Sequence, residues 1–258
     1  MIWTNTALFG NLIPKEKITQ DKTKATSIIL GAFPIDINEF PNVEFVFRAG
    51  VGADNINFSN VRIEFPSNET KDLIYEETAN FTSYLIFKML YDHLGCLNTW
   101  SGIKRNITQD KNLLILGGGN IGSKVYDKMS PFFKNISIYD IKVDPTPPDY
   151  SNADIITLHI PYNSQNKGFI NKKILKQCKD DLILINTARG GLVEEDDLYD
   201  ILIKTDMRAA FDVFWEEPYT GKLTTLSSNK FFMTPHIASS SIEFAQRCYE
   251  DFKQHYGR

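Results

Sequence analysis

Three residues in the second half of the chain carry side chains suited to acid–base chemistry on a small carboxylic acid: Arg189, Glu217 and His236. The guanidinium of Arg189 is a planar two-pronged donor that matches a carboxylate. Histidine exchanges protons near neutral pH, and an anion beside its ring favours the imidazolium and fixes its orientation. Together the three could bind, charge-balance and protonate a 2-oxo acid. The alternative is that Arg189 is a surface charge and Glu217 an ordinary acidic loop residue.

Context separates His236 from the other histidines, which are His93, His159 and His255. His93 falls in a predicted helix and His255 in the polar C-terminal segment, where we expect each to lie on the surface. His159 ends a predicted strand, and such a histidine is structural or lines a cofactor more often than it catalyses. His236 follows a proline in the turn after the last predicted strand, so it is the candidate acid–base residue.

A glycine-rich loop directly follows the apolar run Leu113 to Leu116. Glycines between a strand and a helix let the backbone approach a pyrophosphate, while the helix N-terminus supplies N–H donors and partial positive charge. The alternative is a merely flexible turn. The residues that we assign to a dinucleotide cofactor in this loop are Gly117, Gly119, Asn120, Ile121 and Gly122.

Asp140 strengthens the dinucleotide hypothesis because it lies at the end of the second predicted strand. A carboxylate in that place can accept hydrogen bonds from both ribose hydroxyls. It would also repel a 2′-phosphate, and no arginine follows it immediately, so NAD is favoured over NADP. The alternative is a surface carboxylate at a strand end.

Short apolar strands alternate with amphipathic helical segments from Leu113 onward. The predicted strands are 113–116, 136–139, 155–158, 182–185, 209–213 and 231–233. The predicted helices between them are 121–129, 172–178 and 194–203. Strands separated by helices pair in parallel, and the helices cover both faces of the sheet. The pattern predicts an α/β fold with a doubly wound parallel sheet.

The first part of the chain has a different pattern and is too short for a second full domain of that kind. Its predicted strands are 27–30, 43–47 and 61–65, and long helices are predicted at 76–91 and 239–256. We therefore expect a cofactor-binding domain over residues 77–238. Residues 1–76 would form a second, smaller α/β lobe, completed by the C-terminal helix within 239–258.

Composition excludes several classes of function. The net charge of −4 and the absence of a long basic block argue against nucleic-acid binding. Three cysteines without C-x-x-C spacing suggest neither a disulfide framework nor a zinc site, so we expect no metal and a reducing cytoplasm. The N-terminus does not resemble a signal peptide, and the apolar stretches are too short to span a bilayer.

Four motifs occur in one order along the chain: Ala153 to Pro161, Asn186 to Val193, Asp212 to Pro218, and Thr234 to Ala238. In this arrangement the chain closely resembles the D-isomer-specific 2-hydroxyacid dehydrogenase family, whose cofactor domain has the Rossmann fold. The resemblance extends from about Glu77 to Ala245 and includes the turn from Gly50 to Ile56. Several separate motifs in one order make chance agreement improbable.

The resemblance implies a role for each of the three chemical residues. Arg189 would pair with the substrate carboxylate and polarise its carbonyl, while His236 exchanges the proton and Glu217 hydrogen-bonds His236. Backbone amides of Val51 and Gly52 would hold the same carboxylate, which requires the two lobes to close on one another.

The resemblance also implies further cofactor contacts and a partner. Asp212 would lie near the nicotinamide end of NAD, and the cofactor cleft would be lined by His159, Pro161, Thr187 and Ala188. Relatives pair through their cofactor domains, using the helix that here starts near Glu77, so a homodimer is expected.

The chain departs from the family pattern in its first lobe. Relatives usually carry another strand and helix before the segment that begins here near Thr26, so either residues 1–24 pack over the sheet or a partner subunit covers it. The segment Leu30 to Pro34 lacks the arginine of relatives that bind a phosphorylated substrate, which weighs against 3-phosphoglycerate. Phe33 could line an apolar side-chain pocket or be a core aromatic. Trp215 could cap the active site or pack under its loop.

Two functions remain open at this point. The leading one is an NAD-dependent D-2-hydroxyacid dehydrogenase, or 2-oxo acid reductase, that acts on a small unphosphorylated acid such as glyoxylate, hydroxypyruvate or pyruvate. The alternative is an NAD(H)-sensing, corepressor-like binding module with little turnover, because the resembling family includes such proteins and the first lobe is short.

Overall fold

The computed structural model describes residues 1–91 and 106–256. The predictions for His93 and for Cys96, one of the three cysteines, therefore lie outside the described residues. The chain forms two compact units. The small unit consists of Met1–Glu77 and Ser239–Arg258, and the large unit consists of Thr78–Ala238. Among the described residues, none of the helices combines the length and the apolar character that a bilayer-spanning segment requires.

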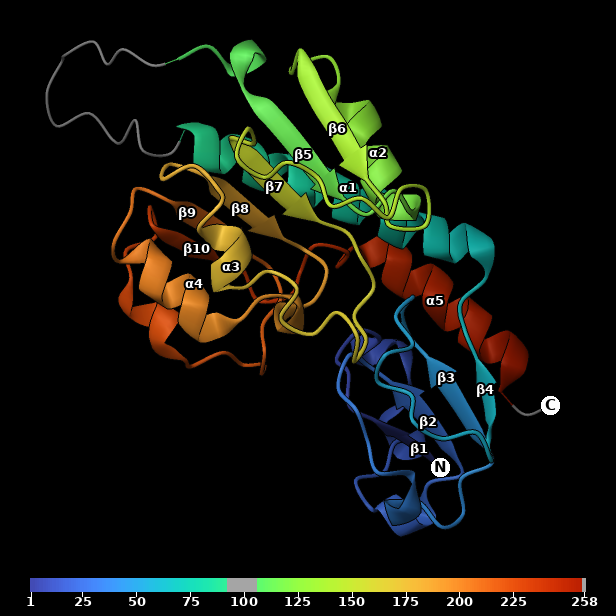
Figure 1. Cartoon of the computed structure of the whole chain (residues 1–258). Coiled ribbons are helices and arrows are strands. Elements are labelled where there is room, and N and C mark those ends of the chain that lie inside the picture. Colours follow the sequence, from blue (N-terminus) through green and yellow to red (C-terminus); the bar gives the residue numbers. More distant parts are fainter. Residues whose placement is uncertain (92–105, 257–258) are drawn as a thin grey trace, which may run out of the picture. The chain divides into compact units, whose positions relative to one another are not determined.

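The large unit is built on a six-stranded sheet in the order β10-β9-β8-β7-β5-β6, and all its neighbouring strands pair in parallel (Figure 1). Its strands are β5 (Asn112–Leu116), β6 (Asn135–Tyr139), β7 (Ile155–Leu158), β8 (Ile183–Asn186), β9 (Arg208–Phe211) and β10 (Phe231–Met233). The strand order reverses between β5 and β7, as in a doubly wound sheet. The predicted fold class is thus confirmed, and each predicted strand agrees with an observed one to within two residues.

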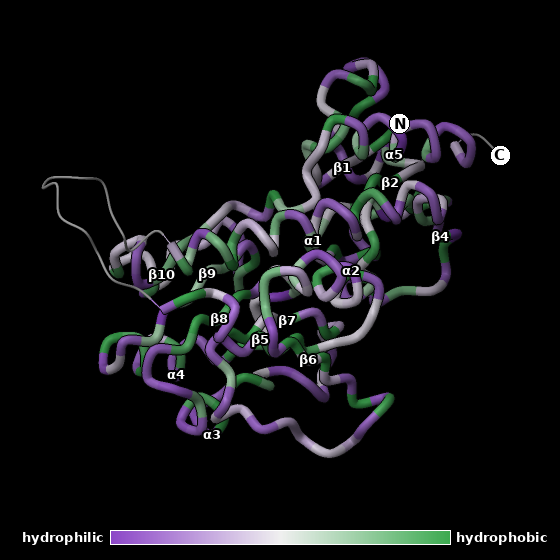
Figure 2. Tube along the Cα trace, turned by 90° about the horizontal axis from the view of Figure 1, so that it is seen from above, coloured by the Kyte–Doolittle hydropathy of each residue, from purple (hydrophilic) through white to green (hydrophobic). Residues whose placement is uncertain are grey.

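Helices cover both faces of this sheet. They are α1 (Asn68–Tyr91), α2 (Asn120–Met129), α3 (Lys172–Leu175) and α4 (Glu195–Leu202). Alternate residues of β5 point to opposite faces: Leu113 and Ile115 join the core formed with α1 and α2, whereas Leu114 and Leu116 join the core formed with α3 and α4. The central strands are hydrophobic along their length, as expected for strands buried on both faces (Figure 2).

Three helix boundaries differ from the prediction by more than one residue. The long helix begins at Asn68, well before Glu76, because Ser67 caps its first turn by accepting a hydrogen bond from Thr70 N. The helix predicted over 172–178 ends at Leu175, after which the backbone continues in turns. The C-terminal helix α5 (Ile242–His255) begins later than predicted because the Ser241 hydroxyl caps it at Phe244 N.

The small unit contains a four-stranded parallel sheet in the order β1-β2-β3-β4. Its strands are β1 (Ile2–Thr4), β2 (Ser27–Leu30), β3 (Phe45–Arg48) and β4 (Arg62–Glu64). The prediction missed β1, since three residues are too few to establish an alternating pattern. The chain therefore does carry a strand before Thr26. Between β1 and β2 it has three short 3-10 helices, Gly10–Leu12, Lys15–Lys17 and Lys22–Lys24, where an α-helix was considered missing.

Residues near the N-terminus supply cover for the small sheet. Ile2, Phe9 and Ile13 are at most 4% exposed and pack in one core cluster. Helix α5 contributes Phe244 and Phe252 to the same cluster. Of the two alternatives for the shortened lobe, packing by residues 1–24 is the one that the structure shows. His255, expected on the surface, is only partly exposed, and its ring lies near that of Phe47.

Candidate active site

Every strand of the large sheet ends immediately before a residue that the sequence singled out or before its motif. The residues that follow β5, β6, β7, β8, β9 and β10 are Gly117, Asp140, His159, Thr187, Asp212 and Thr234. Because all six strands are parallel, these residues lie along one edge of the sheet. Ligands of open α/β sheets bind outside the carboxyl ends of the strands, near the point where strand order reverses. The candidate residues are therefore where this architecture places a site.

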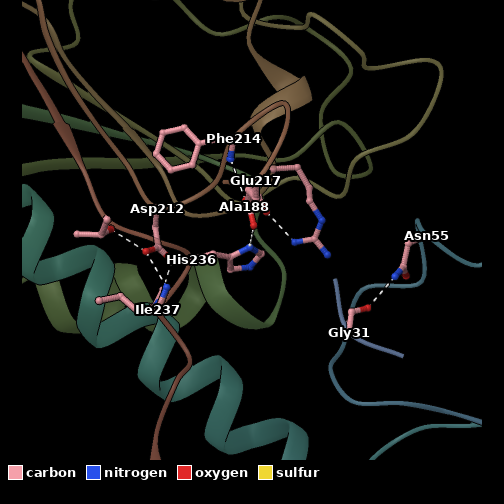
Figure 3. A network of polar contacts seen from close by, with 11 residues as sticks. Gly31, Asn55, Ala188, Asp212, Phe214, Glu217, His236 and Ile237 are labelled. Atoms are coloured by element: carbon pink, nitrogen blue, oxygen red, sulfur yellow. Dashed lines mark hydrogen bonds and ion pairs between the residues drawn. The ribbon is translucent and has the colours of Figure 1, made fainter. Parts of the chain in front are cut away.

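His236 and Glu217 form a hydrogen-bonded pair at this edge (Figure 3). His236 Nδ1 lies 2.8 Å from Glu217 Oε2, and the two side chains are 30% and 17% exposed. The other carboxylate oxygen of Glu217 accepts a hydrogen bond from Phe214 N at 3.1 Å. Each carboxylate oxygen of Glu217 thus has one hydrogen-bond partner. Because Nδ1 of His236 is engaged by Glu217, Nε2 is the ring nitrogen that could exchange a proton with another molecule.

The backbone of His236 adopts φ 52°, in the left-handed region that a non-glycine residue rarely occupies. The fully buried side chain of Asp212 stabilises this conformation through hydrogen bonds to the two residues that follow His236. Asp212 Oδ1 accepts from Ile237 N at 2.9 Å and Oδ2 accepts from Ala238 N at 2.8 Å. Strained backbone that its surroundings hold in place is typical of functional positions.

Asp212 also accepts a hydrogen bond from Thr234 Oγ1 at 2.6 Å, so its carboxylate ties together the two sides of the turn that carries His236. Burial raises the pKa of Asp212, although its three hydrogen bonds and the nearby His236 oppose that rise. The structure therefore gives Asp212 an organising role in the turn. Its predicted place near the nicotinamide stays a prediction.

Arg189 lies between β8 and a 3-10 helix at Gly190–Leu192. Its Nη1 donates to Ala188 O at 2.7 Å. Its backbone is held by Asn186, whose Nδ2 donates to Arg189 O at 2.8 Å and whose Oδ1 accepts from Ala188 N at 3.0 Å. A Cβ on Gly190 would lie 2.5 Å from Trp215 N, so glycine lets the Arg189 segment pack directly on the loop that bears Glu217.

Two positioning residues of this site were missed in the sequence. Asn186 is fully buried, and the signal that could have found it is a polar residue ending an otherwise apolar strand. Thr82 on α1 places its hydroxyl 2.8 Å from that of Thr187, so the helix braces the loop after β8. Nothing in the local pattern distinguishes Thr82, because its role depends on how α1 packs on the sheet.

The glycine loop leaves room for a cofactor at the first turn of α2. A Cβ on Gly117, at φ 108°, would lie 2.6 Å from the His159 carbonyl, and a Cβ on Gly122 would overlap the Gly117 oxygen. Gly119 caps the helix, and nothing lies within 4 Å of where its Cβ would be. Open space beside the helix N-terminus suits a pyrophosphate, which Asn120 and Ile121 in the first turn would also meet.

Asp140 faces this loop. Its Oδ2 accepts from Gly118 N at 3.0 Å and its Oδ1 accepts from Lys142 N at 2.9 Å. These backbone hydrogen bonds lower the pKa of Asp140, so the carboxylate stays ionised at neutral pH. A fixed anion beside the glycine loop is what a ribose-binding acid requires. The loop and Asp140 together fit an NAD cofactor.

His159 lines the same edge, and its surroundings disfavour the charged imidazolium. Burial lowers the pKa of His159 to about 3, and its Nε2 lies 3.0 Å from Thr157 Oγ1. His159 is therefore neutral in the physiological range, which suits a cofactor-lining residue better than an acid. Pro161, further along this segment, accepts a hydrogen bond from Asn166 Nδ2 through its carbonyl.

In the small unit, the turn with Val51 and Gly52 is organised by a residue that the sequence analysis did not single out. Arg48 is 5% exposed, and its Nε donates to Gly52 O at 2.8 Å. A Cβ on Gly50 would lie 2.6 Å from Arg48 Nη1, so glycine permits this approach. The sequence feature that could have identified Arg48 is a charged residue at the end of an otherwise apolar strand.

Phe33 belongs to a fixed segment at the carboxyl end of β2. Its carbonyl accepts from Asn5 Nδ2 at 3.1 Å and from Asn55 Nδ2 at 3.2 Å, and Asn55 Nδ2 also lies 2.8 Å from Gly31 O (Figure 3). Phe33 is 42% exposed, so the alternative of a core aromatic is wrong. The other alternative, that Phe33 lines a side-chain pocket, stays a prediction.

Comparison with known proteins identifies one family. Residues 97–238, more than half of the chain, match the model described as the NAD binding domain of D-isomer specific 2-hydroxyacid dehydrogenases. Hydroxypyruvate reductase of Thermotoga maritima is 28% identical over 251 residues, which cover 89% of this chain and 79% of that protein. D-3-phosphoglycerate dehydrogenase of Mycobacterium tuberculosis is 28% identical over 235 residues, which cover 82% of this chain but only 44% of that protein.

Solved structures show the same fold. NAD-dependent formate dehydrogenase from Staphylococcus aureus in complex with NAD has a TM-score of 0.80 at 20% identity, covering 99% of this chain and 94% of that one. D-lactate dehydrogenase from Aquifex aeolicus complexed with NAD and lactic acid has a TM-score of 0.76 at 18% identity, covering 98% and 93%.

Proposed function

The chain belongs to the D-isomer specific 2-hydroxyacid dehydrogenases, which are NAD-dependent oxidoreductases, and we propose that it interconverts a small unphosphorylated 2-oxo acid and the D-2-hydroxy acid. The observation that carries the proposal is the His236–Glu217 pair, 2.8 Å apart, on the sheet edge that also bears Arg189 and the glycine loop. A proton-exchanging group beside a carboxylate-binding one is the minimum that this reaction needs.

In the proposed mechanism His236 donates a proton to the carbonyl oxygen during reduction and accepts it back during oxidation. Glu217 keeps the imidazole ring oriented and balances its positive charge. Arg189 binds the substrate carboxylate through its two-pronged donor and polarises the carbonyl. NAD, when bound, supplies the hydride donor in one direction and the hydride acceptor in the other. Val51 and Gly52 of the small unit are further proposed carboxylate-binding residues.

The proposed substrate class rests on the resemblance, because relatives that bind a phosphorylated substrate carry an arginine near the segment around Phe33. This segment has no cationic side chain between Leu30 and Pro34, so it offers no partner to a phosphate group. The exposed Phe33 ring instead suits an apolar or very small substituent. Glyoxylate, pyruvate and hydroxypyruvate meet this description, whereas 3-phosphohydroxypyruvate does not.

The direct test measures loss of NADH absorbance with each of these four 2-oxo acids. We expect turnover with at least one unphosphorylated acid and a kcat/KM lower by about tenfold or more for the phosphorylated one, since an unpaired charge must be desolvated. Binding of NADH without turnover of any acid would contradict the proposal. It would favour the nucleotide-sensing module instead.

Asp140 provides a separate prediction on the cofactor. Asp140→Asn removes the charge that would repel a 2′-phosphate while keeping a side chain of the same size. We expect the ratio of NADH to NADPH affinity, measured by fluorescence titration, to fall by about tenfold. Asp144→Asn, in the same loop, is the control and should leave the ratio unchanged. An unaltered ratio in Asp140→Asn would remove Asp140 from the discriminating role.

The family resemblance further supports His159, Pro161, Thr187 and Ala188 as cofactor-lining residues and Asp212 as a residue at the nicotinamide end. A homodimer and a cytoplasmic location are proposals from the resemblance and the sequence. Light scattering of the purified protein would measure the oligomeric state.

A further inference from the structure

The loop that carries Glu217 is closed by a pair of stacked rings. Phe214 and Tyr219 lie on either side of Glu217 in the sequence, and their ring centroids are 4.9 Å apart with an interplanar angle of 16°. Phe214 N also donates to Glu217 Oε1 at 3.1 Å. Stacking on Tyr219 therefore holds Phe214, whose backbone N–H is one of the two hydrogen-bond partners of the Glu217 carboxylate.

Tyr219 is itself anchored outside the loop. Its hydroxyl donates to Glu195 Oε1 at 2.6 Å, at the start of α4, and accepts from Leu223 N at 3.2 Å. Burial raises the pKa of Tyr219 and Glu195 adds to the rise, so the phenol keeps its proton as a donor. The hydroxyl thus connects the loop to a helix of the large unit.

Gly221 makes this anchor possible. A Cβ on Gly221 would lie 2.6 Å from Glu195 Oε1 and closer still to Tyr219 Oη. The side chain of Trp215 supports the same arrangement, because its Nε1 donates to Val193 O at 2.7 Å and its ring lies 5.7 Å from that of Tyr219. Of the two alternatives for Trp215, packing under its loop is therefore the one that these contacts favour.

We propose that Tyr219 is a positioning residue for the Glu217–His236 pair, acting through the Phe214 ring and anchored to α4 by Glu195. The inference rests on the proposed function, in which Glu217 orients His236. The anchor matters because Glu217 lies on an irregular loop, and a small displacement of a proton-transfer group lowers the reaction rate steeply.

The test uses Tyr219→Phe, which keeps the ring stack and removes the anchor. We expect kcat for 2-oxo acid reduction to fall by about three- to tenfold, as for the loss of one hydrogen bond, with the dissociation constant of NADH unchanged. Gly221→Ala disturbs the same anchor from the other side and should give the same result. Tyr126→Phe, at an exposed tyrosine on α2, is the matched control and should keep the native kcat.

A double variant distinguishes positioning from a general structural role. If Tyr219 acts through Glu217, Tyr219→Phe should change kcat by less than about twofold in a Glu217→Gln background. Equal losses in the two backgrounds, or a native kcat in Tyr219→Phe alone, would overturn the inference. If Glu217→Gln itself keeps the native kcat, the assigned role of Glu217 in the proposed function fails instead.

The ring nitrogen signals of His236 provide a readout that does not depend on turnover. In the native protein these signals report the hydrogen bond from Nδ1 to Glu217. We expect the Nδ1 signal to shift in Tyr219→Phe and in Gly221→Ala but not in Tyr126→Phe. Unshifted signals in both loop variants would overturn the inference even if no 2-oxo acid were turned over.

Discussion

His236→Asn is expected to lower kcat for 2-oxo acid reduction by about 10²–10⁴-fold, the range that general acid–base groups contribute. Asparagine cannot exchange the proton, but it is one of the few non-glycine residues that tolerate the left-handed backbone found at φ 52°. The variant should therefore keep the turn held by Asp212. Stopped-flow measurement of NADH oxidation gives kcat, and fluorescence titration should give an unchanged dissociation constant for NADH.

His255→Gln is the control for His236→Asn. It also removes a partly buried histidine, but one that lies in helix α5 of the small unit. It should retain native turnover. A His236→Asn protein that reduces 2-oxo acids at the native rate would show that another group supplies the proton. His159 would be a poor substitute, since burial lowers the pKa of His159 to about 3, so the acidic imidazolium form is scarce at neutral pH.

Arg189→Lys is expected to lower kcat/KM for a 2-oxo acid by about 10²–10³-fold, comparable with loss of a preorganised donor at a reacting oxygen. Lysine keeps the positive charge but loses the planar fork that matches a carboxylate. Both KM and kcat should change, because the same side chain is proposed to bind the acid and to polarise its carbonyl. Arg247→Lys, at an exposed site in α5, is the control and should behave like the native protein.

A substrate without a carboxylate makes the Arg189 experiment specific. Glycolaldehyde retains a reducible carbonyl but lacks the acid group of glyoxylate. If Arg189 binds that group, the penalty of Arg189→Lys should be clearly smaller for glycolaldehyde than for glyoxylate. Equal penalties would mean that Arg189 acts on the carbonyl alone or through the folded structure.

The large sheet could be predicted from the sequence because each of its strands is a short apolar run between helices. Ile155–Leu158 and Phe231–Met233 were predicted at their observed bounds. The three-residue strand β1 was missed, since its position is specified by pairing with β2 and by burial of Ile2 rather than by a local pattern. The early start of α1 was missed because its first turn is polar.

The candidate site could be predicted only as far as residue types and motif order allow. The hydrogen bond between His236 and Glu217 agrees with the predicted pairing, but their catalytic roles stay predictions. The left-handed backbone of His236, the amide contacts of Asn186 and the anchor of Tyr219 could not be predicted. Each depends on which loops meet at the edge of the sheet, and that is settled by contacts between distant parts of the chain.

The discontinuous small unit has a consequence for the order in which the protein can fold. Its aromatic core joins Phe45 and Phe47 from β3 with Phe252 from α5. During synthesis the ribosome releases all of residues 78–238 before α5, so the large unit can close while Phe45 and Phe47 still lack their partner. The apolar faces of Phe45 and Phe47 in the nascent small sheet therefore lack the cover of Phe252 until helix α5 has been synthesised.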